Sequence, residues 1–137
     1  MPIYKFIAKN KEKNIIIMSV GSCNTTIEKD SYKAVLIYQN NHKVLQRDLI
    51  TRSANRCILY GIKEATEAIK KPSDVIIISP APLGFRTRKS VNYNICEEII
   101  DILTEKNCNI KIVTCEGMGN EIRNYINLLS SKKTPRL

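Results

Sequence analysis

Few side chains in this sequence are suited to bind a transition metal, and their spacing is poor for that task. The five cysteines form no C-x-x-C pair, and the single histidine, His42, falls in a predicted turn. Short Cys or His spacings are the usual signature of a zinc site. We therefore expect no zinc site, and reduced cysteines buried in the apolar segments that flank several of them. The cysteines are Cys23, Cys57, Cys96, Cys108 and Cys115.

Positively charged side chains are the second group with a clear chemical use. The formal net charge is +9, and such a surplus on a small domain attracts polyanions, chiefly nucleic acid or an anionic membrane. Arg86, Arg88 and Lys89 place three cations within four residues, where they would meet phosphates. The alternative is a solvated loop on a basic protein without a nucleic-acid partner, because part of the charge is spread over helix faces and termini.

Hydrophobic periodicity predicts the elements that position these residues. Nearly unbroken apolar runs are typical of strands buried on both faces, and apolar residues at helical spacing predict amphipathic helices. The predicted strands are residues 14–20, 32–38, 43–50, 74–79 and 109–115, and the predicted helices are residues 54–71, 95–105 and 120–131. The second and third strands would form an antiparallel hairpin across an Asn-containing turn.

This order of elements, β-β-β-α-β-α-β-α, predicts an α/β domain with a mixed five-stranded sheet and helices packed on it. A chain of 137 residues suits one such domain. Residues 1–13 are interpreted as an N-terminal arm, residues 14–131 as the domain, and residues 132–137 as a basic tail. The sequence has no signal-peptide core and no apolar stretch of bilayer-spanning length, so we expect a cytoplasmic protein without a membrane partner.

Two local sequences, together with this element order, resemble type 1 ribonuclease H over residues 14–131. The first strand of that family ends in an Asp-Gly-Ser turn, and here residues 20–22 read Val-Gly-Ser. The family's first helix opens with Asn-Arg-x-Glu-Leu, and here residues 55–59 read Asn-Arg-Cys-Ile-Leu. The resemblance implies a ribonuclease H-like fold and, in active members, cleavage of the RNA strand of RNA–DNA hybrids by two Mg²⁺ ions that four carboxylates hold.

The positions that correspond to those four carboxylates hold no acid in this chain. They are Val20, Ile58, Pro80 and Asn124. Mg²⁺ prefers octahedral oxygen coordination, and Val, Ile and Pro have no side-chain oxygen. The nearby acids, which we do not expect the fold to place at the strand ends, are Glu28, Asp30, Glu64 and Asp74. We expect no metal, no cofactor and no catalysis, with apolar side chains filling the former site.

The resemblance also implies a phosphate-binding pocket just before the first long helix, where a hydroxyl, an amide and the helix N-terminus act together. Arg52, Ser53 and Asn55 stand in that place. The alternative is that Ser53 caps the helix and Asn55 is an ordinary residue of its first turn. The two roles are compatible.

The sequence thus favours a catalytically inactive ribonuclease H-like domain that binds nucleic acid, or a nucleoprotein complex, through a basic surface. The ligand would be an RNA–DNA hybrid, a duplex or a single strand. The alternative is a scaffold that binds a protein partner or forms a homodimer, in which the former site is only structural. An active ribonuclease H with a non-standard site is the third hypothesis.

Overall fold

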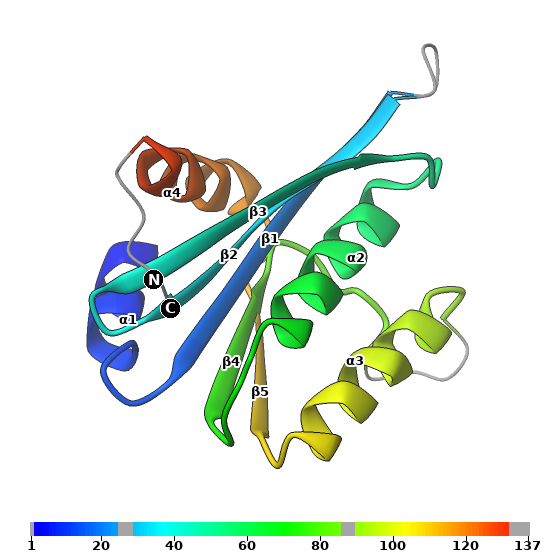
Figure 1. Ribbon diagram of the computed structural model, residues 1–137. Coiled ribbons are helices and arrows are strands. Elements are labelled where there is room, and N and C mark those ends of the chain that lie inside the picture. Colours follow the sequence, from blue (N-terminus) through cyan, green and yellow to red (C-terminus); the bar gives the residue numbers. More distant parts are fainter. Residues whose placement is uncertain (1, 25–28, 86–89, 132–137) are drawn as a thin grey trace.

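A computed structural model describes residues 2–24, 29–85 and 90–131 of the chain (Figure 1). The strands are β1 (Ile15–Asn24), β2 (Lys29–Tyr38), β3 (Asn41–Leu49), β4 (Asp74–Ser79) and β5 (Asn109–Thr114). The helices are α1 (Ile3–Asn10), α2 (Ala54–Glu67), α3 (Tyr93–Glu105) and α4 (Gly119–Ser130). The strands form one sheet in the order β3-β2-β1-β4-β5, antiparallel from β3 to β1 and parallel from β1 to β5. This mixed sheet confirms the predicted fold class.

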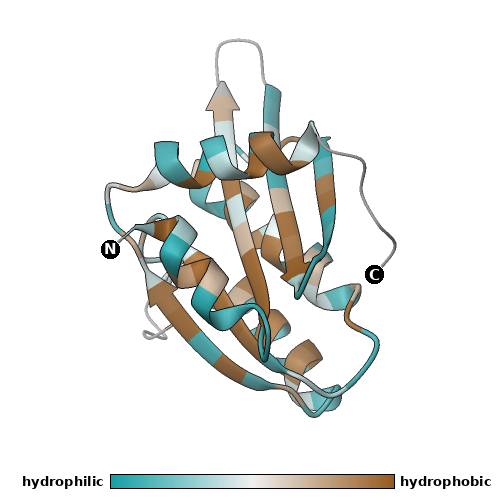
Figure 2. Cartoon of the chain, turned by 90° about the vertical axis from the view of Figure 1, so that its left-hand side faces the viewer, coloured by the Kyte–Doolittle hydropathy of each residue, from teal (hydrophilic) through white to brown (hydrophobic). Residues whose placement is uncertain are grey.

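Alternating side chains along β1 build two hydrophobic cores, one on each face of the sheet. Ile15 and Ile17 contribute to the core under α2 and α3, whereas Ile16, Met18 and Val20 contribute to the core under α1 and α4. The two pairs of helices lie on opposite sides of the sheet in Figure 1, and Figure 2 views the molecule from the side of α1 and α4. Burial on both faces explains why the sequence of β1 is almost wholly apolar in its first half.

The N-terminal arm that we expected over residues 1–13 contains a helix, α1. This helix buries Ile3 and Ile7, one turn apart, in the core that it shares with α4. The Tyr4 ring also meets the Tyr125 ring of α4 edge-on, with 5.1 Å between their centroids. Packing must supply the stability of α1, because isolated helices this short are marginal in water. None of the helices in the described chain is long and apolar enough to cross a membrane.

Strand β1 extends further than the sequence predicts. Gly21 was expected to end it, but β1 continues to Asn24 because β2 pairs with it as far as Lys29. Gly21 serves a different purpose, since a Cβ there would lie 2.7 Å from the Ala54 carbonyl oxygen and 2.9 Å from the Cβ of Cys57. Helix α2 therefore lies closer to β1 than any side chain at this position would permit.

Gly61 provides a second close approach of α2 to the sheet. A Cβ at this position would collide with the Ser19 hydroxyl of β1 and would lie 2.9 Å from Cδ1 of Tyr32 on β2. Gly21 and Gly61 together hold α2 against the sheet at two points. The contact at Gly21 places the N-terminus of α2 beside the second half of β1.

Helix α2 ends at Glu67 and not, as predicted, at Lys71. The Lys106 ammonium group donates hydrogen bonds to the carbonyl oxygens of Thr66, Glu67 and Ile69 at 2.9, 2.8 and 2.7 Å. These bonds satisfy carbonyls that the end of an α-helix leaves without partners, and they place a cation where the helix dipole favours one.

The substitution Gly61→Ala tests the contact between α2 and the sheet. The added methyl group is forced against Ser19 and Tyr32, so we expect the free energy of unfolding to fall by about 1 to 3 kcal/mol. Denaturant unfolding measures the change, and a second substitution, Ser19→Ala, should restore part of the loss by removing the colliding hydroxyl. Gly119→Ala is the control, because its Cβ would meet only the Cβ of Pro80 at 3.7 Å. Equal unfolding free energies for the two alanine variants would contradict the close approach.

Candidate nucleic-acid interface

The structure places the four positions that correspond to the family's carboxylates in different surroundings. Val20 is 2% exposed in the core under α1 and α4, whereas Ile58 is 5% exposed in the core on the opposite face. Pro80 is half-buried directly after β4, and Asn124 is exposed on α4. We expected these apolar side chains to fill the metal site that the resemblance implies. Val20 and Ile58 instead extend two separate hydrophobic cores, one on each face of the sheet.

These residues do not fit the pair of Mg²⁺ ions that the resemblance implies. Val20, Ile58 and Pro80 have no side-chain oxygen to offer, and Asn124 supplies only an amide. In residues 2–24, 29–85 and 90–131, no three His, Cys, Asp or Glu side chains lie together in an arrangement that could hold a metal ion.

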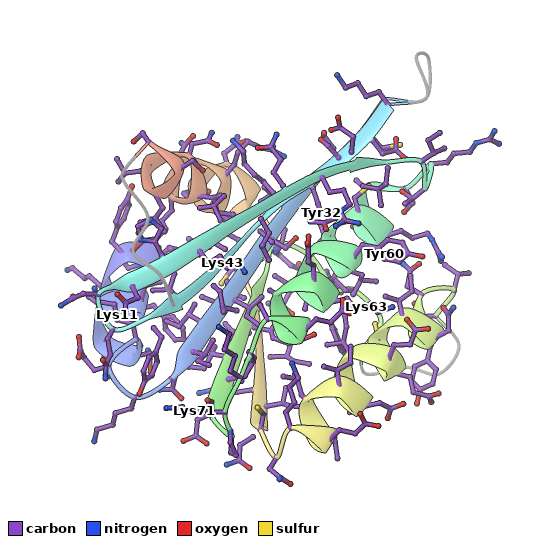
Figure 3. The ribbon with its side chains drawn as sticks, viewed as in Figure 1. Lys11, Tyr32, Lys43, Tyr60, Lys63 and Lys71 are labelled. Atoms are coloured by element: carbon purple, nitrogen blue, oxygen red, sulfur yellow. The ribbon has the colours of Figure 1, made fainter. Side chains whose placement is uncertain are left out.

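Two of the acids that could replace the missing metal ligands, Glu64 and Asp74, lie away from these four positions. Glu64 accepts a hydrogen bond from the Tyr32 hydroxyl and forms a 3.4 Å ion pair with Arg47. Tyr32 lies between the sheet and α2 (Figure 3). Asp74 begins β4 and therefore lies at its amino end, opposite to the carboxyl end where Pro80 follows. Glu28 lies outside the described residues.

Asp30 is the remaining acid, and it organises the turn that leads into α2. Asp30 is 2% exposed, and its carboxylate accepts the backbone N–H groups of Thr51 and Arg52, each at 2.6 Å. These two bonds help to hold Arg52 at a φ of 60°, a conformation that few non-glycine residues adopt. The Thr51 N–H above all, and then the Cys23 thiol, stabilise the ionised carboxylate and lower the pKa of Asp30 to about 2.

This turn leaves fewer donors for the phosphate pocket predicted at Arg52, Ser53 and Asn55. The Ser53 hydroxyl accepts the N–H of Arg56 at 3.3 Å, which confirms that Ser53 caps α2. The two backbone N–H groups just before Ser53 already bind Asp30, whose negative charge would also repel a phosphate. Any phosphate contact here depends on the side chains of Arg52, Ser53 and Asn55.

Three cations that we did not single out from the sequence lie around the second half of β1, Arg56 on the face that α2 covers and the other two on the face that α4 covers, and we refer to them as the cationic end. Arg56, in the first turn of α2, donates to the Asn92 amide oxygen at 3.3 Å. Arg123, on α4, donates to the Gly21 carbonyl oxygen at 3.3 Å. Lys33, on β2, is the cross-strand partner of Val20, the residue before Gly21. None of the three has a carboxylate partner among the described residues. They belong to three elements, so no local sequence motif reveals them.

A groove of about 640 Å³ between β3 and α2 has a mixed charge. Lys43, Arg47 and Lys63 line it together with Glu64 and Glu67. Figure 3 labels Lys43 and Lys63 on its two sides. Because the groove presents acids among its cations, it favours a polyanion less than the cationic end does.

The order of the strands, their directions and the helices on both faces match a known architecture. Among solved structures, the chain is similar to ribonuclease H1 of the halophilic archaeon Halobacterium salinarum, with a TM-score of 0.61. The two share 12% sequence identity over 87% of this chain and 99% of that chain. The chain has a ribonuclease H-like fold. No protein-family model matches the sequence, and no curated protein matches it.

One predicted part of the interface of this ribonuclease H-like domain lies outside the described residues. It is the basic loop with Arg86, Arg88 and Lys89, and it stays a prediction. The described chain continues from β4 to Phe85 and resumes at Ser90, shortly before α3.

The Asp30 turn predicts how stability depends on pH. The folded-state pKa of about 2 is below the unfolded value of about 3.9, so the stabilisation is complete above about pH 4 and is lost as the pH falls towards 2. Asp30→Asn should lower the melting temperature at pH 7 and flatten the fall in stability between pH 4 and pH 2. Thermal unfolding followed by circular dichroism measures both effects.

The control for this experiment is Asp101→Asn. Asp101 is exposed on α3 and has no hydrogen-bond partner among the described residues, so its loss should leave the pH dependence close to that of the parent. A fall in stability between pH 4 and pH 2 that is as steep in Asp30→Asn as in the parent would show that this carboxylate does not organise the turn.

Proposed function

We propose that this ribonuclease H-like domain is non-catalytic and binds the sugar–phosphate backbone of nucleic acid. The observation that carries the proposal is that, around Val20 and Gly21 in the second half of β1, cations are present where the resemblance implies metal-binding acids. The positions that would hold metal-binding acids carry Val20 and Asn124, while Lys33, Arg56 and Arg123 bring positive charge to the same part of the sheet. Cations without carboxylate partners are the side chains that attract a phosphate backbone.

The distribution of ion pairs in the described chain supports this location. The pairs Arg47–Glu64 and Lys63–Glu98 both involve the second half of α2, so their positive charge is partly neutralised there. The cationic end lies at the other end of α2, where Asp30 accepts backbone N–H groups and forms no ion pair with Lys33, Arg56 or Arg123. With a net charge of +9, the molecule retains a large surplus that a polyanion would neutralise.

The predicted basic loop belongs to the same proposed interface. Arg86, Arg88 and Lys89 follow β4 in the chain, and β4 ends beside the middle of β1, since Met18 and Ile78 are the last pair between these parallel strands. The side chains of Arg52, Ser53 and Asn55 complete the proposed surface. Contacts of these kinds would fix the position of a backbone without reading its sequence, so a hybrid, a duplex and a single strand are all candidate ligands.

A second candidate function is a contact with a protein partner or with a second copy of the chain. Tyr4 is 56% exposed on α1, and Leu128 is 44% exposed on α4. The edge-on contact of Tyr4 with Tyr125 joins the two helices at this surface. Exposed apolar side chains that gather on one face are typical of protein contacts.

Salt-dependent binding separates the two candidate functions. We expect labelled RNA–DNA hybrid, DNA duplex and single-stranded RNA to bind with an affinity that falls steeply between 50 and 200 mM salt, roughly as for other proteins that release counterions. Combining Arg86→Ala, Arg88→Ala and Lys89→Ala should reduce the slope of log K against log salt by about 2.1 to 2.7, which is three contacts at 0.7 to 0.9 each. Fluorescence anisotropy measures both quantities.

The matched control removes three cations from the opposite end of the sheet, with Lys11→Ala, Lys13→Ala and Lys71→Ala. These lysines precede β1 or β4, and Figure 3 shows Lys11 and Lys71. Equal slopes in the loop variant and the control would remove the loop from the interface. If the parent binds none of the three nucleic acids near 150 mM salt, the backbone-binding function is wrong and the scaffold function gains support.

A further inference from the structure

We propose that Arg123 and Lys33, with Asn127, form a phosphate-binding site that stands in the place of the metal site of active ribonuclease H. This inference rests on the proposed function and identifies which side chains would hold the backbone. The ligand is a phosphodiester group of a nucleic acid, and its negative charge would be met by two fixed side-chain cations.

Arg123 links two of the four positions that the resemblance assigns to metal ligands, Val20 and Asn124. The guanidinium Nη2 donates to the carbonyl oxygen of Gly21, which directly follows Val20. Arg123 itself directly precedes Asn124 on α4. The guanidinium group therefore reaches from the helix that would supply one metal ligand to the strand that would supply another.

Most of the hydrogen-bonding capacity of this guanidinium is unused within the described chain. A guanidinium group carries five N–H donors in a rigid fork, and the Gly21 carbonyl is the one acceptor that the described residues offer Arg123. The side chain is half-buried, so its charge is less screened than that of a fully exposed arginine. The fork geometry matches the paired oxygens of a phosphodiester.

Lys33 brings a second cation to the same place. It is the cross-strand partner of Val20, and its Nζ donates to the Asn127 amide oxygen at 2.8 Å. Asn127 lies one helical turn after Arg123, so the two residues share a face of α4. Because its oxygen is bound to Lys33, the Asn127 amide has its NH₂ group left to donate to a ligand.

Both cations are held without a neutralising acid, and this favours a ligand that is itself anionic. Glu121, in the first turn of α4, and Asp48, on β3, are the exposed acids on the elements around them. Neither forms an ion pair with Lys33 or Arg123 in the structure. If Arg123 served only to join α4 to β1, position 123 would need a hydrogen-bond donor but no positive charge.

This difference between a donor and a charge defines the test. Arg123→Gln and Lys33→Gln each keep a donor for the existing partner and remove the cation. In the double variant, the salt slope for the RNA–DNA hybrid should fall by about 1.4 to 1.8, two contacts at 0.7 to 0.9 each. Because the counterion contribution vanishes near 1 M salt, this corresponds to roughly 25- to 60-fold weaker binding at 0.1 M salt. Anisotropy titrations in EDTA measure it.

Two comparisons make the result specific. The control is Lys11→Gln with Lys71→Gln, which removes the same charge from the amino ends of β1 and β4 and should leave affinity within about twofold. Arg123→Lys, with Lys33 unchanged, should have the salt slope of the parent, because lysine keeps the positive charge at position 123. If the glutamine variant weakened binding through a fold defect, its melting temperature would fall and the lysine variant would not recover the slope.

The outcomes separate this inference from the proposed function. If the parent binds the hybrid and the glutamine double variant matches the control, the phosphate site is wrong and the proposed function survives. If the parent does not bind the hybrid, a DNA duplex or single-stranded RNA, both are wrong. If the parent binds polyglutamate of equal charge as tightly as nucleic acid, the site recognises acidic protein segments and the phosphate assignment is overturned.

Discussion

The close packing of α2 on the central strands is the constraint on which the rest of the structure depends. Gly21 and Gly61 carry no Cβ, and the space that each would need is occupied by atoms of the other layer. Helix α2 is therefore fixed in height and position over β1 and β2. Its N-terminus is consequently held beside Gly21 in the second half of β1, and Asp30 accepts hydrogen bonds from the turn that precedes the helix. The arrangement of the candidate interface follows from this packing.

In that part of the sheet, the chemistry of the side chains opposes a metal pair and favours an anion. A cluster of carboxylates repels itself unless a metal neutralises it, and each buried acid would then have a raised pKa. Val20 and Ile58 avoid this cost by extending the two hydrophobic cores. Lys33, Arg56 and Arg123 bring positive charge to this part of the sheet, where Asp30 is the buried acid of the turn before α2.

The sequence was sufficient to predict the sheet, its mixed directions and the three long helices, because hydrophobic periodicity and the buried strands reflect the two cores directly. It was not sufficient for α1, since two buried residues one turn apart are too short a pattern to distinguish a helix from an apolar arm. The end of β1 was also misplaced. A glycine within a strand was interpreted as a turn, whereas its role is to accommodate Ala54 and Cys57 of α2.

The candidate interface was harder to predict than the fold, for a related reason. Ser53 was identified because an N-cap is a local signal, and the structure confirms the cap. The competing carboxylate of Asp30 reaches the same turn from β2, and Arg123 reaches Gly21 from the last helix. Both contacts join residues far apart in the sequence, so only the folded chain reveals them. The first occupies two backbone donors of the predicted phosphate pocket, and the second brings a cation beside Val20, a position that the resemblance assigns to a metal ligand.

The most direct test of the central claim is a cleavage assay on a labelled RNA–DNA hybrid with Mg²⁺ and, separately, Mn²⁺. Without side-chain oxygens at positions 20, 58 and 80, we expect no cleavage above that of an active-site mutant of a genuine ribonuclease H purified in the same way. Metal-dependent cleavage that follows this protein through two different chromatographic separations would contradict it.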